Sequence, residues 1–411
     1  MPALFTTIPT QANPDERPAA DSRKAANAAA VLRATLDHGP VARSTIAQLT
    51  GLSPAAVSRQ LTELAGHGLV RERPVRGPRS TVGRPHVPVD IDTRRHVVAG
   101  VHIAVPQATL VLMDLRGRVL IEQRVPHPDP AAASVLADVG DRMTRFLAEH
   151  TNGRQVLGVG VAVGGWVDPT RGAVVRHAPL GWWDVPIREV LERRLGLPVR
   201  VESHGRALAR AEQLVGRERV RARTSLVHLF VGNVVDAAIA TGGAVHHGPR
   251  SGAGDVSHLP VGGDARCGCG RTGCFEAAVA AHAITQRAAD DGRVPVPRFA
   301  DVLAALKADE PWAVELFRRR LRLIGRAVAL LLDVINPELL LVCEAGTARR
   351  PDLIADLHEE VARHSHVCPD PRRTVLPGSF GIGALGIAGG AVILHDIYAH
   401  PLEIPARPAQ T

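Results

Sequence analysis

Spacing of apolar positions predicts two short helices near the start of the chain. Residues 22–38 carry alanine and leucine at helical intervals and end at Gly39-Pro40, a combination that stops a helix. Residues 43–51 have the same character and end in a glycine. In this second helix the positions expected to face inward are Ile46, Ala47 and Leu49.

A third helix is predicted from Ser53-Pro54, because serine caps free N–H groups and proline suits the first helical turn. Its apolar stripe is Val57, Leu61 and Leu64, at i, i+4 and i+7. Residues 68–73 predict a short strand, followed by a segment rich in proline, glycine and arginine. This order is typical of a winged helix-turn-helix.

The opposite face of the third helix predicts DNA contacts, because small and polar side chains can enter a major groove. Arg84 suits a narrow minor groove. A packing bundle is the alternative, but the wing and the local charge, 13 Arg and Lys against 8 Asp and Glu in residues 1–95, favour DNA. The candidate contacts are Arg43, Ser53, Ala55, Ser58, Arg59, Gln60 and Arg84.

From His96 onward, strands alternate with helices, which predicts an α/β body. The order of elements after Ser225 partly repeats the order after His96, so two related lobes with a cleft between them are expected. The strand candidates are 96–103, 108–114, 117–125, 156–163, 225–231, 236–240, 244–247 and 339–343, and the helix candidates are 131–150 and several between 276 and 334.

Length and composition indicate how many domains the chain can form and where they end. The 411 residues are 45% hydrophobic, enough for several cores. We expect a flexible tail at 1–20, the winged helix at 21–92 and the body at 96–400, with lobe 1 about 96–205 plus the C-terminal helix and lobe 2 about 206–380. No apolar run of membrane-spanning length and no leader are expected, and five cysteines suit the cytoplasm.

One cluster has the composition of a metal site. Thiolates and imidazole are ligands that Zn²⁺ favours, and four of them complete a tetrahedron with no open position. The intervening glycines allow tight turns, so clustered free cysteines are the weaker alternative. The sequence predicts one structural zinc ion per chain, bound by His258, Cys267, Cys269 and Cys274.

Taken together, these motifs resemble the ROK family of repressors and sugar kinases. The resemblance rests on Gly83-Arg84-Pro85, the α/β body, and Gly252–His258 leading into Cys267–Glu276, and it extends over about residues 22–398. It implies an actin-like, ribonuclease-H-like fold of two lobes and a sugar-binding cleft. In members with an N-terminal extension it also implies ligand-controlled repression or activation.

Three departures from the kinase pattern argue against phosphoryl transfer, which needs a base and a phosphate cradle. The family's Asp-x-Gly-Gly-Thr turn reads His102-Ile-Ala-Val-Pro106, with proline lacking an N–H. The Glu-Asn-Asp-Ala stretch that carries the catalytic carboxylate reads Glu202-Ser-His-Gly205. The second glycine-rich turn reads Gly232-Asn-Val-Val-Asp236.

The resemblance implies effector contacts at Asp255, His258 and Glu276, with Ser203 and His204 in place of the sugar-gripping Asn-Asp pair. His204 is equally compatible with a packing role between the lobes. We expect a DNA-binding regulator of the repressor type that senses a sugar or other polar metabolite. It is expected to bind an inverted-repeat operator as a homodimer or homotetramer. The alternative is a sugar kinase with a DNA-binding extension.

Overall fold

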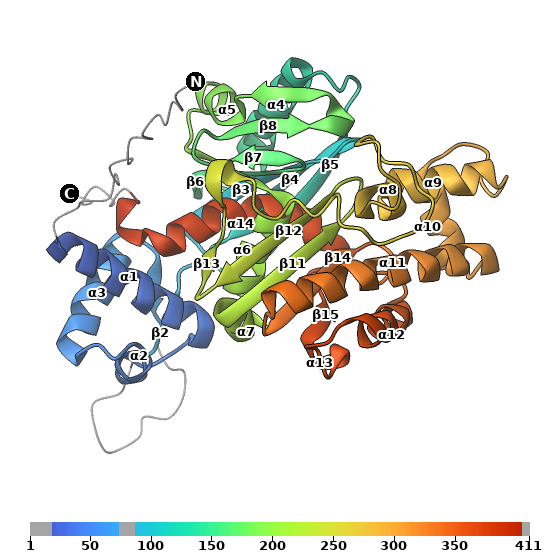
Figure 1. Cartoon of the computed structure of the whole chain (residues 1–411). Helices are drawn as coiled ribbons and strands as arrows, with labels where there is room; N and C mark the ends of the chain where they lie inside the picture. The colour runs from blue at the N-terminus through green and yellow to red at the C-terminus, as the bar shows by residue number, and fades with distance from the viewer. Residues whose placement is uncertain (1–18, 74–86, 405–411) are drawn as a thin grey trace, which may run out of the picture. The chain divides into compact units, whose positions relative to one another are not determined.

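The computed structural model describes residues 19–73 and 87–404, which form two compact units (Figure 1). One unit contains the described residues up to Asp92 together with those from Asp396 on. The other contains Thr93–His395. The C-terminal residues from Asp396 therefore group with the N-terminal unit, although the sequence suggested a body extending to residue 400.

The N-terminal unit is a three-helix bundle with a two-stranded ribbon. Its helices are α1 (Ala19–His38), α2 (Arg43–Thr50) and α3 (Pro54–Gly66), and antiparallel strands β1 (Val70–Glu72) and β2 (Val89–Ile91) follow. The short helix η5 (Pro401–Glu403) contacts α1 and α3. Helix α1 begins at Ala19, within the stretch expected to be a tail.

Local sequence signals set the ends of α2 and α3. Gly51 takes a left-handed conformation (φ 67°) where α2 stops, and the Ser53 side chain accepts a hydrogen bond from the Ala56 N–H at the start of α3. Ile46 and the α3 stripe are buried as predicted. The prediction that Leu49 faces inward is wrong, since it is 49% exposed. Leu49 lies three positions after Ile46, at the edge of a short apolar stripe.

The body contains two five-stranded sheets with the same topology. In each, the first three strands pair antiparallel and the next two add in parallel. The orders are β10-β6-β3-β4-β5 and β13-β12-β11-β14-β15. The first sheet contains β3 (His96–Ile103), β4 (Gln107–Asp114), β5 (Val119–Pro126), β6 (Gln155–Val163) and β10 (Val199–Ser203). The second contains β11 (Ser225–Val231), β12 (Val235–Thr241), β13 (Ala244–Val245), β14 (Leu339–Glu344) and β15 (Val375–Pro377).

Helices and a small third sheet surround these strands. The small sheet consists of β7 (Trp166–Asp168), β8 (Ala173–His177) and β9 (Trp182–Val185). Longer helices follow the strands: α4 (Ala132–His150), α5 (Ile187–Leu195), α6 (His204–Val215), α7 (Arg219–Thr224), α8 (Phe275–Val279), α9 (Ala281–Asp290), α10 (Phe299–Lys307), α11 (Pro311–Ile335), α12 (Ile354–His364), α13 (Pro371–Thr374) and α14 (Ala384–Ala399). The 3₁₀ turns of the body are η1 (Ala178–Leu180), η2 (Pro249–Ser251), η3 (Pro351–Leu353) and η4 (Gly381–Gly383).

Separate apolar cores lie on the two sheets, and a smaller one joins them. The joining cluster takes Ala162 from β6, Leu208 from α6, Phe230 from β11 and Ala388 and Val392 from α14. Since these residues come from both sheets, the lobes share buried apolar area as well as polar contacts.

Helix α14 lies in direct backbone contact with the first sheet. A Cβ on Gly100 would overlap the backbone of Gly390, and a Cβ on Gly160 would overlap the carbonyl oxygen of Gly389. Glycine at these positions allows the helix to lie closer to β3 and β6 than any side chain would permit.

The expectation that no apolar run reaches membrane-spanning length is wrong for one segment. Gly381–Ala399 has 19 residues, and the mean hydropathy of its most apolar window is 1.5. Inside the protein, 61% of that window is buried. The segment is apolar because most of α14 packs inside the body, so it has the features of a core helix.

We predict that Gly160→Ala destabilises the body by about 2 kcal/mol or more, because the added methyl must displace α14 from the sheet. Gly383→Ala is the control, since no atom lies within 4 Å of a Cβ at that position. Urea unfolding of the full chain measures both. Equal midpoints for the two variants would show that α14 can move away at little cost.

Candidate functional site

The exposed face of α3 is the candidate DNA-reading surface. Ala55, Arg59 and Thr62 are exposed and Ser58 is half-buried, which places all four on one side of the helix. The Arg59 guanidinium has no hydrogen bond or ion pair among the described residues, so it is available to a partner. Thr62 was missed from the sequence, although its spacing from Ala55 and Arg59 places it on the same stripe.

The prediction that Gln60 reaches DNA is wrong. Its side chain is 7% exposed and lies with Val57, Leu61 and Leu64 on the buried face. The helical period explains this, because position 60 lies three residues after Val57 and four before Leu64. Polarity alone suggested exposure, whereas position on the helix determines it.

Two further candidates have structural partners. Arg43 forms an exposed ion pair of 2.7 Å with Glu72 on β1, and Ser53 acts as the cap of α3. The Arg43–Glu72 pair is exposed and therefore weak, so Arg43 stays a candidate phosphate contact. Ser53 is exposed and also stays a candidate. Arg84 lies outside the described residues.

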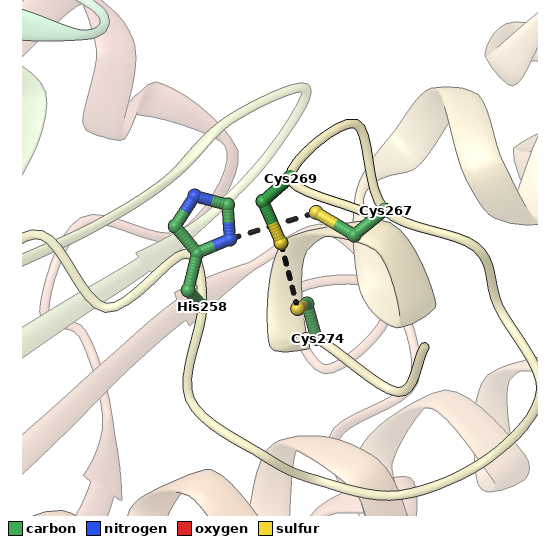
Figure 2. A group of neighbouring side chains, drawn as sticks. All are labelled: His258, Cys267, Cys269 and Cys274. Carbon is green, nitrogen blue, oxygen red and sulfur yellow. Dashed lines mark hydrogen bonds between the residues drawn. The ribbon is translucent and has the colours of Figure 1, made fainter. Parts of the chain in front are cut away.

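The predicted metal ligands come together in the body. The nearest ligand atoms of His258, Cys267, Cys269 and Cys274 all lie within 4.8 Å of one another (Figure 2). The Cys267 Sγ to His258 Nδ1 distance is 3.5 Å and the Cys269 Sγ to Cys274 Sγ distance is 3.7 Å. A tetrahedral zinc site with ordinary bond lengths places S and N about 3.5 Å apart and two S atoms about 3.8 Å apart. The residues therefore fit a zinc ion.

A knuckle of backbone hydrogen bonds presents these ligands. Cys267 N–H bonds to the Arg271 carbonyl and Gly270 N–H bonds to the Cys267 carbonyl, with Gly270 at φ 87°. The Arg271 side chain donates to Cys269 Sγ, and this bond lowers the pKa of Cys269 to about 6. The thiolate form of Cys269 is favoured as a result, whereas burial and the neighbouring Cys269 and Cys267 raise the pKa of Cys274 to about 11.

The implied effector residues divide into two groups. Glu276, beside the knuckle, accepts the Val235 N–H at 3.0 Å, and burial raises its pKa. Asp255 and His258 are exposed and close enough to affect its charge. Glu276 also lines an open hollow of about 630 Å³ together with Cys267, His282, Gln286, Arg287 and Asp290.

The second group, Ser203 and His204, is buried at the start of α6. The His204 ring stacks on His102 with centroids 4.4 Å apart and meets the edge of Phe230 at 4.9 Å. Burial lowers the pKa of His102 to about 3, and burial with the nearby His102 and His177 lowers the pKa of His204 well below its usual range. Both imidazoles are therefore neutral at physiological pH.

A carboxylate that the sequence analysis did not single out, Asp236, also lies at the start of α6. Asp236 accepts the Gly205 N–H at 2.9 Å, while Ser203 accepts the Arg206 N–H at 3.5 Å. Two of the free N–H groups at the start of α6, those of Gly205 and Arg206, are thus satisfied within the protein. Burial raises the pKa of Asp236 to about 6, opposed by the Gly205 N–H and Arg206. The sequence feature that could have identified Asp236 is its position at the end of the altered glycine turn, Gly232–Asp236.

A buried ionic cluster adjoins this centre. Glu202 is 0% exposed and pairs with Arg206 (2.6 Å), Arg210 (2.9 Å) and His247 (3.3 Å). Arg206 also donates to the carbonyls of Val167 and Ser251. Burial alone would raise the pKa of Glu202, but these partners outweigh it and lower the pKa to about 2.

The turn where kinases hold phosphate is narrow here. The Ala104 N–H bonds to the Gln107 carbonyl, which leaves Val105 and Pro106 as a two-residue loop. Proline has no N–H, so the loop tip offers few donors to a phosphate group.

Comparisons with known proteins agree with this architecture. Residues 98–392 match the ROK family, and residues 25–79 match the MarR family. The crystal structure of a ROK family transcriptional regulator homologous to the Escherichia coli MLC protein superposes with a TM-score of 0.76 at 23% identity, covering 93% of this chain and 98% of that one. A ROK family glucokinase from Streptomyces griseus, with glucose and AMPPNP, superposes at 0.62 with 25% identity, covering 72% and 98%.

Relatives with similar sequences are regulators. A transcriptional regulator of Mycobacterium tuberculosis is 35% identical over 388 residues, covering 91% of this chain and 86% of its own. The DNA-binding transcriptional dual regulator NagC of Escherichia coli is 26% identical over 401 residues, covering 93% and 97%. The chain therefore belongs to the ROK family, with a MarR-type winged helix preceding its ROK body.

Proposed function

We propose that the protein is a DNA-binding transcriptional regulator, acting as a repressor, whose ROK body senses a sugar or another polar metabolite. The observation that carries this proposal is the exposed stripe on α3, with Arg59 unpaired among the described residues at the centre of a winged helix. Relatives named as transcriptional regulators support it. Such a protein works in the cytoplasm on duplex DNA.

The proposed effector contacts are Asp255, His258 and Glu276 at the rim and Ser203 and His204 deeper in the cleft. The rim residues are near solvent, whereas Ser203 and His204 are 1% and 4% exposed. A ligand that reaches the deeper pair must separate α6 from β12, where Asp236 bonds to Gly205. A ligand that prefers the separated arrangement would shift its population and so affect DNA affinity.

Sugar kinase activity is the alternative, and the geometry opposes it. A kinase needs a base at the sugar hydroxyl and donors at the phosphates. Here the base position carries neutral, stacked His204, the Gly205 and Arg206 N–H donors of α6 are occupied, and the β3–β4 turn ends in proline. ATP-dependent phosphorylation of a common hexose above a no-enzyme control would overturn this part of the proposal.

We further propose that His258, Cys267, Cys269 and Cys274 hold one structural zinc ion. All four ligand positions come from the protein, so the ion would link the knuckle to α8 and leave no site for water. A dimer or tetramer formed through the body would present paired winged helices to an inverted repeat.

Removing a zinc ligand should remove the metal. Cys269→Ser is expected to lower the zinc content from about one per chain to near zero and to lower the melting temperature by several degrees, since metal binding contributes to folding stability. Metal analysis and thermal unfolding measure both. Cys343→Ala, which changes a cysteine outside the cluster, should keep its zinc. A folded, native protein purified without metal would contradict the proposal.

Removing Arg59 should weaken DNA recognition. On a duplex selected by the full chain from a random library, Arg59→Ala should cost about 1–3 kcal/mol and relax the preference at one base pair. Arg298→Ala removes one charge from the body and is the control. Affinity and sequence preference unchanged in Arg59→Ala would count against α3 as the reading helix. For Arg84, which lies outside the described residues, Arg84→Ala should weaken binding at A/T-rich flanks.

A further inference from the structure

Four arginines line a cavity on the second lobe, beside the loop that carries the predicted metal ligands. Arg319, Arg322 and Arg326 follow one face of α11 at i, i+3 and i+7, and Arg287 comes from the last turn of α9. The cavity has a volume of about 210 Å³ and is closed on another side by Gly262, Gly263 and Asp264. Like charges at this helical spacing repel one another, so the arrangement needs compensating negative charge.

Carboxylates compensate these charges only in part. Arg322 pairs with Glu315 at 2.6 Å and Asp356 at 3.4 Å. Arg326 pairs with Glu360 at 2.7 Å and donates to the Val261 carbonyl.

The remaining two arginines are held more weakly. The nearest ion-pair partner of Arg319 is Asp264, with its Oδ1 3.9 Å from the Arg319 Nη2, and the Asp264 side chain is 88% exposed. The Arg287 guanidinium has no hydrogen bond or ion pair among the described residues, although the residue is half-buried. A half-buried guanidinium with five N–H donors and no partner points to an acceptor outside the chain.

The shape of the cavity favours a small acceptor with several oxygens. Guanidinium groups match phosphate by paired, charge-assisted hydrogen bonds. A cavity below about 300 Å³ is small for a drug-sized ligand but accommodates a tetrahedral anion. The two glycines of the rim take φ values of 82° and 92°, and Gly262 lies beside the Arg326 guanidinium, so backbone approaches the same space.

We propose that Arg287, Arg319, Arg322 and Arg326 form a binding site for a small phosphate-bearing anion, either inorganic phosphate or a phosphomonoester. The site is separate from the effector residues and goes beyond the proposed DNA-binding function. Arg287 lies between this cavity and the hollow that contains Glu276, since both are lined by it. A bound phosphomonoester can thus extend its remaining atoms toward polar groups.

Titration calorimetry of the full chain in a phosphate-free buffer tests the site. Inorganic phosphate and glycerol 3-phosphate are the ligands, and sodium chloride at matched ionic strength is the blank. Saturable binding of one anion per chain is expected. Tighter binding of the ester than of phosphate would identify an esterified ligand, and the reverse would identify inorganic phosphate.

Arg287→Gln should weaken this binding about 10- to 100-fold, because it removes a charge-assisted contact. Arg287→Lys should recover part of it, since the charge returns without the paired donors. Arg318→Gln is the control, because Arg318 is on the same helix and pairs with Asp356 at 3.7 Å but does not line the cavity. Since the Arg287 guanidinium bonds to no described residue and its variants keep the backbone bond to Asp291, they should fold.

Three results would overturn the proposal. The first is a heat of titration with sodium chloride that equals the heat with phosphate, which would indicate a basic surface covered by solvent. The second is identical affinity in Arg287→Gln and the unmodified protein. The third is loss of affinity for random-sequence duplex DNA in Arg287→Gln with no binding of either small anion, which would assign the arginines to DNA phosphates.

Discussion

The buried carboxylate of Glu202 is the charge on which the centre of the body depends. A carboxylate without solvent is unstable unless cations and donors surround it. Arg206, Arg210 and His247 supply that surrounding, and the Ser203 N–H adds a further hydrogen bond. Removing Glu202 would leave the Arg206 guanidinium, 3% exposed, without its counter-ion, and broken buried pairs of this kind cost about 3–5 kcal/mol.

The geometry of the cleft follows from that pairing. Arg206 contacts the carbonyls of Val167 on β7 and Ser251 on η2, so one guanidinium fixes segments that approach from the small third sheet and from the second lobe. The Trp166 indole adds a bond to the Arg250 carbonyl at 2.8 Å. These contacts link the two lobes through the protein's own donors and acceptors.

The pKa values of the same centre have opposite pH consequences. The pKa of Glu202 is lowered to about 2, so its stabilising contribution is present above its unfolded value and is lost as the pH falls toward 2. The pKa of Asp236 is raised to about 6, so its ionised form opposes folding above that pH. Protonation of Asp236 near pH 6 therefore relieves a cost at the junction of α6 and β12.

Much of this structure could be predicted from the sequence where one local rule decides. The apolar runs of β3 and β11 and the Ser53 cap were predicted with the correct bounds, because hydrophobic period and capping chemistry act locally. The clustering of His258, Cys267, Cys269 and Cys274 was predicted from the chemistry of zinc ligands.

One prediction failed on a local rule, because Gln60 is buried by its position on the helix despite its polarity. Other predictions failed where distant segments meet. The apolar stretch of α14 reflects packing on two strands that lie about 290 and about 230 residues upstream. The arginine cavity combines α9, α11 and a glycine loop, and no single stretch of sequence shows it.

Footprinting of the full chain on fragments of the genome that encodes it is the decisive experiment for regulation. We expect protection of a few sites, each an inverted repeat whose halves lie about one or more helical turns apart, with the protection altered by a metabolite. Protection spread uniformly over the fragments, without a shared sequence, would contradict it.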